Sequence, residues 1–78
     1  MDTIGRRIKH VRQRALMTQA DLAQAAGVAL ITANRLENDA IDNPRPDTVR
    51  KLARALGVDP AWLLFGEQEE GAIPKLAA

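Results

Sequence analysis

The sequence predicts an all-α domain built from five short helices, and three observations lead to this fold class. Apolar residues recur at intervals of three and four, the helical period, while the strict alternation typical of a half-buried strand is missing. Proline, glycine and capping residues separate the periodic segments, as they do at helix ends. The chain of 78 residues has room for one small domain.

The first expected helix covers residues 3–15, and one side of it is apolar. Residues three or four apart face the same way because each helical residue turns by about 100°. The residues of this stripe are Ile4, Ile8, Val11 and Ala15. Arginine and lysine occupy the other side, so we expect the stripe to face a core and the charges to face solvent.

Two further helices, 18–26 and 29–37, follow each other so closely that they predict a helix-turn-helix. Thr18 is an expected N-cap, and Asp21 three residues later approximates a capping box. Gly27 lies where a left-handed residue ends a helix. The apolar stripes expected to face the core are Leu22, Ala23 and Ala26, then Val28, Ala33 and Leu36.

The last two expected helices, 46–56 and 60–65, begin at prolines and end before glycines. Pro46 and Pro60 suit the first position of a helix, where no backbone N–H bond is needed. The other capping residues are Gly57, Asp59 and Gly66, and the apolar stripe of the longer helix is Val49, Leu52, Ala53 and Leu56. Residues 67–78 have no sustained period and are expected to form a flexible tail or a linker.

The composition argues against several classes of protein. Cysteine is absent and His10 is the single histidine, so we expect no disulfide, no metal and no cofactor. No apolar run approaches the roughly 20 residues of a membrane span, which favours a cytoplasmic protein without a membrane partner. No nucleophile or acid–base constellation is evident, so we predict that the chain is not an enzyme.

The formal net charge is only +1, but the charges lie in blocks. Residues 1–17 and 48–58 are basic, whereas residues 18–47 and 59–78 are acidic. The local field of a basic block can attract a polyanion, although basic helix faces are also typical of solvated surfaces.

The outer side of the helix at 29–37 is the candidate surface for reading DNA, because a helix that protrudes from a helix-turn-helix fits the major groove. Projection at about 100° per residue places Leu30, Ile31, Asn34, Arg35 and Asn38 on that side. Arg35 is suited to bond guanine O6 and N7, with a salt bridge or a phosphate contact as the alternative. Asn34 is expected either to reach an adenine edge or to face the DNA backbone.

Four motifs occur in one order along the chain: IGRRI, TQADLAQAAGV, LEN and ALGVDPAWLLFG. With them, residues 4–66 resemble the lambda-repressor-like (Cro/repressor, XRE-type) helix-turn-helix family, and the ending is similar to lambdoid phage repressors. The resemblance implies a compact five-helix DNA-binding domain over residues 1–66. Leu30 and Ile31 depart from the family pattern, which commonly has polar residues there. They are expected to contact thymine methyl groups or to form a protein interface.

The resemblance also implies a set of phosphate contacts. Thr18 and Gln19 match positions that bind a DNA phosphate at a helix start, although Thr18 has the alternative role of a cap. Asn38 matches a phosphate contact beyond the third helix and has the alternative role of its C-cap. Arg45 matches a position that reaches the DNA backbone or the minor groove, and Thr32 completes the expected set.

An orienting ion pair is implied by the same resemblance. Arg12 and Glu37 match positions whose ion pair ties the first helix to the end of the recognition helix. Arg7 is expected either to join this network or to be solvated.

A homodimer is the last implied feature. Trp62 is expected to pack inward while Leu63 faces outward, and Pro60 and Leu63 are the expected dimer contacts. The alternative is that Leu63 and Phe65 close the core. A two-fold dimer would place two recognition helices about 34 Å apart, on a near-palindromic site.

These observations predict a transcriptional regulator that binds double-stranded DNA sequence-specifically, and repression by occupying an operator is inferred from the resemblance. The alternative is a protein-interaction module, such as an antitoxin or a regulatory adaptor, with Leu30 and Ile31 on the protein surface that it binds.

Overall fold

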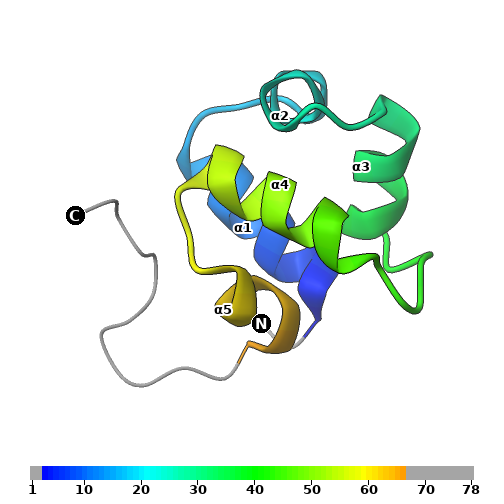
Figure 1. The fold of residues 1–78 in the computed structure, drawn as a ribbon. Helices are drawn as coiled ribbons and strands as arrows, with labels where there is room; N and C mark the ends of the chain where they lie inside the picture. Colours follow the sequence, from blue (N-terminus) through cyan, green and yellow to red (C-terminus); the bar gives the residue numbers. More distant parts are fainter. Residues whose placement is uncertain (1–2, 67–78) are drawn as a thin grey trace.

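The computed structural model describes residues 3–66. These residues form five α-helices and the loops between them, and no strand occurs among them. The helices are α1 (Ile4–Arg14), α2 (Gln19–Ala26), α3 (Leu30–Glu37), α4 (Pro46–Leu56) and α5 (Pro60–Phe65). In Figure 1, α1 and α4 run through the middle of the molecule, between α2 and α5. The all-α class is confirmed, and each observed helix end lies within one residue of the expected one. The tail expected at 67–78 lies outside the described residues.

Local capping explains where α2, the first helix of the helix-turn-helix, begins and ends. Thr18 Oγ1 accepts the backbone N–H of Asp21 at 2.9 Å, and the Asp21 carboxylate accepts the backbone N–H of Thr18 at 2.9 Å. This is a complete capping box. Gly27 ends α2 with φ +74°, a left-handed conformation that costs glycine little. The turn between α2 and α3 is therefore specified by the residues that form it.

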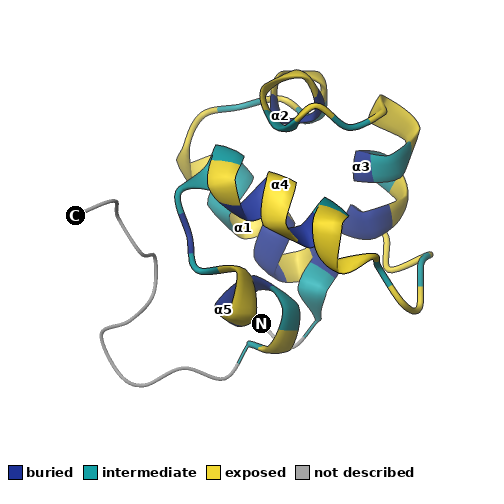
Figure 2. Ribbon diagram, in the orientation of Figure 1, coloured by how far each residue is buried: buried dark blue, intermediate teal, exposed yellow. Residues whose placement is uncertain are grey.

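The core lies where the apolar sides of all five helices meet, and Figure 2 shows the buried residues on the inward sides. It consists of Ile8, Leu22, Leu36, Val49, Leu52, Ala53, Val58, Trp62 and Leu63. Contacts join α2 to α3 and α4, α1 to α3 and α5, and α4 to α5. The core thus holds α3 by its inner side and leaves its outer side uncovered.

The prediction that Leu63 faces outward is wrong, because its exposed fraction is 0%. The short helix α5 contacts both α1 and α4, so a wide arc of its surface is buried and includes both Trp62 and Leu63. Phe65 is instead the exposed apolar residue of this helix, with an exposed fraction of 69%. Ala15, expected in the apolar stripe of the first helix, is also exposed and forms the C-cap of α1.

Arg7 is buried and binds the end of α5 rather than lying in solvent. Its exposed fraction is 4%. Arg7 Nε donates to the carbonyl of Leu63 at 2.9 Å, and Nη2 donates to the carbonyl of Leu64 at 2.9 Å. These carbonyls lie at a helix C-terminus, where they lack intrahelical donors. Arg7 therefore fastens α5 to α1.

The end of α3 is fastened to the start of α1 by a close backbone approach at Gly5. A Cβ atom on Gly5 would lie 2.5 Å from the Leu36 carbonyl oxygen and 2.6 Å from that of Glu37. Just beyond α3, the Asp39 carboxylate accepts the Gly5 N–H at 3.1 Å and the Thr3 hydroxyl at 3.0 Å. This contact fixes where α3 ends relative to the rest of the fold.

Candidate nucleic-acid interface

The start of α2 offers an exposed helix N-terminus next to α3. Thr18 is exposed and Gln19 is half-buried. Hydrogen bonds from the backbone N–H and the side chain of Thr18 lower the pKa of the Asp21 carboxyl below its usual 3.8, so this group is charged at neutral pH. Thr18 is confirmed as a cap, and the amides around it lie at the positive end of the helix dipole.

The outer side of α3 combines two large apolar side chains with an arginine. Leu30 and Ile31 have exposed fractions of 51% and 54%, and Arg35 is exposed one helical turn further along. The opposite side is fixed in the core by Ala33 and Leu36, which are 0% and 1% exposed. The expected outward orientation of these three residues is confirmed. Such a surface, held rigidly from behind, is suited to enter a groove.

A buried ion pair joins α1 to the end of α3, as expected. Arg12 Nε donates to Glu37 Oε2 at 2.5 Å and Nη2 to Oε1 at 2.9 Å, while Nη1 donates to the carbonyl of Met17 at 2.8 Å. The side chains are 11% and 2% exposed. Hydrogen bonding to Glu37 raises the pKa of the Arg12 guanidinium, so this group stays charged. Its position sets the direction of α3.

The ion pair continues into a chain of amide side chains that reaches the surface. Gln19 Nε2 donates to Glu37 Oε1 at 3.0 Å, and Asn34 Nδ2 donates to Gln19 Oε1 at 3.2 Å. Asn38 Nδ2 then donates to Asn34 Oδ1 at 3.3 Å. Asn38 is also the C-cap residue of α3. Helical projection predicts that Asn34 and Asn38 face outward, but it does not predict that they are bonded to each other or to Gln19; Asn38 is exposed and Asn34 is half-buried.

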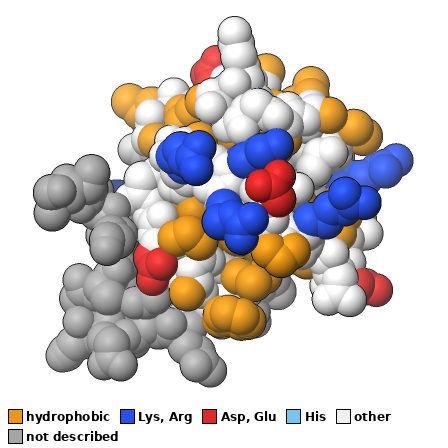
Figure 3. Space-filling model, viewed as in Figure 1, with side chains coloured by type: hydrophobic (Ala, Val, Ile, Leu, Met, Phe, Trp, Pro, Cys, Tyr) orange, Lys and Arg blue, Asp and Glu red, His pale blue; other side chains and the backbone are white. Residues whose placement is uncertain are grey.

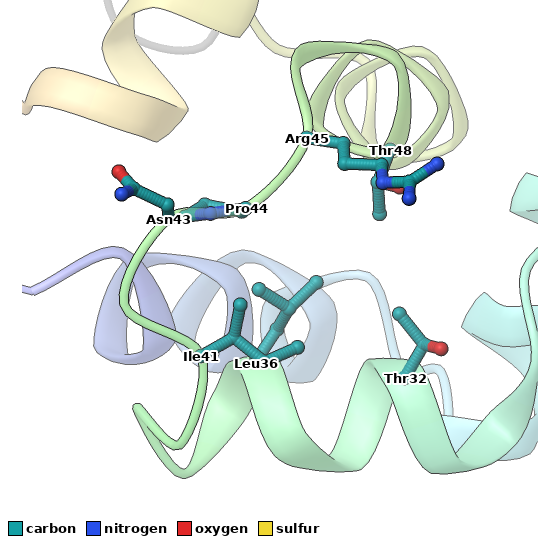
Figure 4. Close-up of a pocket in the computed structure, with 7 residues that line it drawn as sticks. All are labelled: Thr32, Leu36, Ile41, Asn43, Pro44, Arg45 and Thr48. Atoms are coloured by element: carbon teal, nitrogen blue, oxygen red, sulfur yellow. The ribbon is translucent and has the colours of Figure 1, made fainter.

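A pocket of about 270 Å³ lies between α3 and the loop that leads to α4 (Figure 4). Its lining residues are Thr32, Leu36, Ile41, Asn43, Pro44, Arg45 and Thr48. The structure therefore brings Thr32 and Arg45 together, although they lie in different elements. Asn43 and Thr48 are polar lining residues that sequence reasoning missed, because the irregular loop has no period that would orient them.

The face formed by α4 and α5 differs in character from the outer side of α3. Figure 3 shows lysine and arginine side chains over α4, with hydrophobic side chains below them. Asp47 approaches Lys51 at 3.3 Å and Arg50 at 3.6 Å, and all three side chains are exposed. Exposed pairs of this kind contribute little to stability. A groove of about 230 Å³ between the two helices is lined by Pro46, Val49, Arg50, Pro60, Ala61 and Leu64.

The described residues hold no group of three or more histidine, aspartate or glutamate side chains that could bind a metal ion. Within residues 3–66, no helix has the length and apolar character required to cross a membrane.

The sequence and the fold are both similar to those of known helix-turn-helix proteins. A helix-turn-helix family profile matches residues 8–63. The chain is 31% identical over 65 residues to the HTH-type transcriptional repressor RghR of Bacillus subtilis (strain 168), covering 83% of this chain and 48% of RghR. The chain thus spans about half the length of that relative.

Two solved structures have the same arrangement of helices. The P22 c2 repressor protein, in complex with a synthetic operator, has a TM-score of 0.78 and 27% identity, covering 86% of this chain and 100% of that chain. SinR from Bacillus subtilis, in complex with DNA, has a TM-score of 0.75 and 31% identity, covering 78% of this chain and 97% of that chain.

Proposed function

Because this chain belongs to the helix-turn-helix family, in its lambda-repressor-like branch, we propose that it binds double-stranded DNA sequence-specifically and represses transcription by occupying an operator. The observation that carries the proposal is the outer side of α3, where Leu30, Ile31 and Arg35 are exposed on a helix fixed in the core from behind. RghR is a transcriptional repressor, and the P22 c2 and SinR structures contain DNA, which supports this reading.

Base reading is assigned to three residues of α3. The Arg35 guanidinium has the fork geometry that bonds guanine O6 and N7, an interaction worth about 1–3 kcal/mol of discrimination. Leu30 and Ile31 have only apolar contacts to offer, and the C5 methyl of thymine is the apolar group that the major groove presents. We therefore expect a half-site that contains both guanine and thymine.

Phosphate contacts are assigned to two places on either side of this surface. Gln19 and the capped start of α2 form one, since free amides at a helix N-terminus bind anions. The pocket lined by Thr32 and Arg45 forms the other, since a hydroxyl and a guanidinium from its two walls can both donate to a phosphate. Asn38, exposed at the end of α3, is a third proposed phosphate contact.

The test is selection of bound sequences from a random duplex pool, followed by anisotropy titrations on the selected and scrambled duplexes. Arg35→Ala should flatten the preference at one base pair, whereas Gln19→Ala should weaken all duplexes by a similar factor. Arg54→Ala is the matched control, because it removes an exposed arginine from α4 and should leave the preference unchanged. Equal losses on every duplex for Arg35→Ala would remove Arg35 from the base-reading role.

A protein-interaction module is the second candidate, and the exposure of Leu30 and Ile31 favours it. Salt separates the two functions. Binding through about 6 phosphates gives a slope near −5 for log affinity against log salt concentration, whereas an apolar protein contact responds little. If no duplex binds at low salt, DNA binding is excluded.

We also propose that the protein binds as a homodimer through the α4–α5 face, with Pro60 and Phe65 at the contact. The apolar groove between these helices and the 69% exposure of Phe65 support this. Leu63 has no part in the contact, since it is fully buried. Phe65→Ser should lower affinity for a two-half-site duplex and leave affinity for a single half-site unchanged. Equal affinity of wild type and variant for the two-half-site duplex would exclude this dimer face.

The proposed function also implies where and how the chain acts. It binds the DNA that it regulates in the cytoplasm, and it regulates by occupying the operator rather than by catalysing a reaction. Incubation with a labelled operator duplex should return the duplex chemically unchanged.

A further inference from the structure

We propose that Asn34 is a positioning residue, which acts on DNA through Gln19 and Asn38 and not by reading a base. Its side chain is bonded at both ends, to Gln19 at 3.2 Å and to Asn38 at 3.3 Å. It thus links the first residue of α2 to the residue that caps α3. This inference rests on the proposed function, since it assigns how the same surface holds its phosphate contacts.

The direction of the amide chain is dictated by the carboxylate of Glu37. An ionised carboxylate only accepts hydrogen bonds, so Gln19 must turn its Nε2 toward Glu37. The carbonyl oxygen of Gln19 then faces Asn34, which must donate from Nδ2, and this leaves Asn34 Oδ1 to accept from Asn38. A flip of any one amide would place two acceptors or two donors face to face.

As a consequence, each amide of this series keeps one N–H group for a further hydrogen bond. A primary amide has two N–H groups, and Gln19, Asn34 and Asn38 each donate one of them to the next side chain in the series. The oxygens of Gln19 and Asn34 are turned toward neighbouring side chains. The remaining N–H groups suit a ligand that only accepts hydrogen bonds, and a phosphodiester is such a ligand.

Burial makes this orientation rigid at its inner end. Glu37 has a side-chain exposure of 2% and is held by two bonds from Arg12. Gln19 is half-buried and receives its orientation from that fixed carboxylate, and Asn34 is half-buried beside it. Exposure increases along this series of side chains, which ends at the exposed Asn38. Asn34 is the one member that bonds to two amides, so its removal separates Gln19 from Asn38.

The experiment compares Asn34→Ala, Gln19→Ala and the double variant on duplexes selected by the wild type. Asn34→Ala should weaken binding to every duplex by about threefold to tenfold, the typical effect of a neutral hydrogen bond, with an unchanged base preference. The double variant should lose less affinity than the product of the two single losses, because part of the Asn34 effect is transmitted through Gln19. Gln24→Ala is the control and should match wild type, because it removes an exposed glutamine of α2 that is not one of the hydrogen-bonded amides.

A measurement on the free protein tests the positioning role without DNA. The side-chain amide of Gln19 should have a high NMR order parameter in the wild type, and Asn34→Ala should lower it, while Gln24→Ala leaves it unchanged. An unchanged Gln19 order parameter, a changed preference at one base pair, or multiplicative losses in the double variant would each overturn the inference. A wild type that binds no duplex would instead overturn the proposed function itself.

Discussion

Removal of the Arg12 guanidinium tests whether the ion pair beneath the recognition helix stabilises the fold. Arg12→Met keeps the apolar stem and removes three donated hydrogen bonds, two to the Glu37 carboxylate and one to the carbonyl of Met17. The Glu37 side chain is 2% exposed, so water does not replace the lost donors. Gln19 is the donor to Glu37 that remains.

The expected cost is large relative to the stability of a small domain. Breaking a buried ion pair by removing one partner costs about 3–5 kcal/mol, because a charge is left without compensation. A domain of this size has a free energy of unfolding of roughly 4–12 kcal/mol, at about 0.05–0.15 kcal/mol per residue. Arg12→Met should therefore lose about a quarter or more of the total free energy of unfolding.

Urea unfolding followed by far-UV circular dichroism measures this loss. With a slope of about 1 kcal/mol per molar urea, the midpoint should fall by about 3 M or the variant should be unfolded without urea. Arg12→Met/Glu37→Leu should regain stability, since no charge is then buried alone. Lys51→Met, which breaks an exposed pair with Asp47, is the control and should change the free energy by about 0.5 kcal/mol or less. A midpoint for Arg12→Met close to that of the control would refute the reasoning.

Three further predictions concern the scaffold that presents α3. Gly5→Ala should cost about 1–3 kcal/mol in urea unfolding, the reverse of the usual gain in a helix, because its Cβ would lie 2.5 Å from the Leu36 carbonyl oxygen. Leu16→Gly should raise the free energy of unfolding by about 0.5–1 kcal/mol, since Leu16 is 91% exposed and has a φ of +60°; a lower melting temperature would contradict this. The pKa of Asp21 is lowered in the folded state, so its contribution is present above pH 3.8 and is lost as the pH falls through the lower folded-state value. Asp21→Asn should lack this part of the acid dependence of the melting temperature, and identical profiles would show that the Thr18 cap is not the cause.

Helix ends were predictable from sequence because their causes are local. The capping box joins Thr18 and Asp21, which are three positions apart, and the left-handed glycines end helices through their own backbone freedom. The same holds for Pro46 and Pro60, which occupy the first positions of α4 and α5. The absence of a side-chain cap at Ala29 also follows from its lack of a polar atom.

The contacts that sequence reasoning missed join residues distant in the chain. The bond from Arg7 to the Leu63 carbonyl spans 56 positions, and that from Gly5 to Asp39 spans 34. Neither follows from helical period, because each depends on how two helices meet. The error at Leu63 has the same origin: a projection of one helix assumes one covering surface, whereas α5 has two neighbours.

The candidate site shows why exposure alone does not assign a functional role. Helical projection predicts the same outward side of α3 for Asn34 and Arg35, and their spacing does not distinguish their roles. The structure distinguishes these two residues, because Asn34 is bonded to two neighbouring amides while Arg35 is exposed at the adjacent position. An amide already bonded on both sides has less freedom to reach a base edge than an exposed arginine has. The base-reading and positioning roles therefore depend on where hydrogen-bonding groups are already used, which only the crossing of α2 and α3 determines.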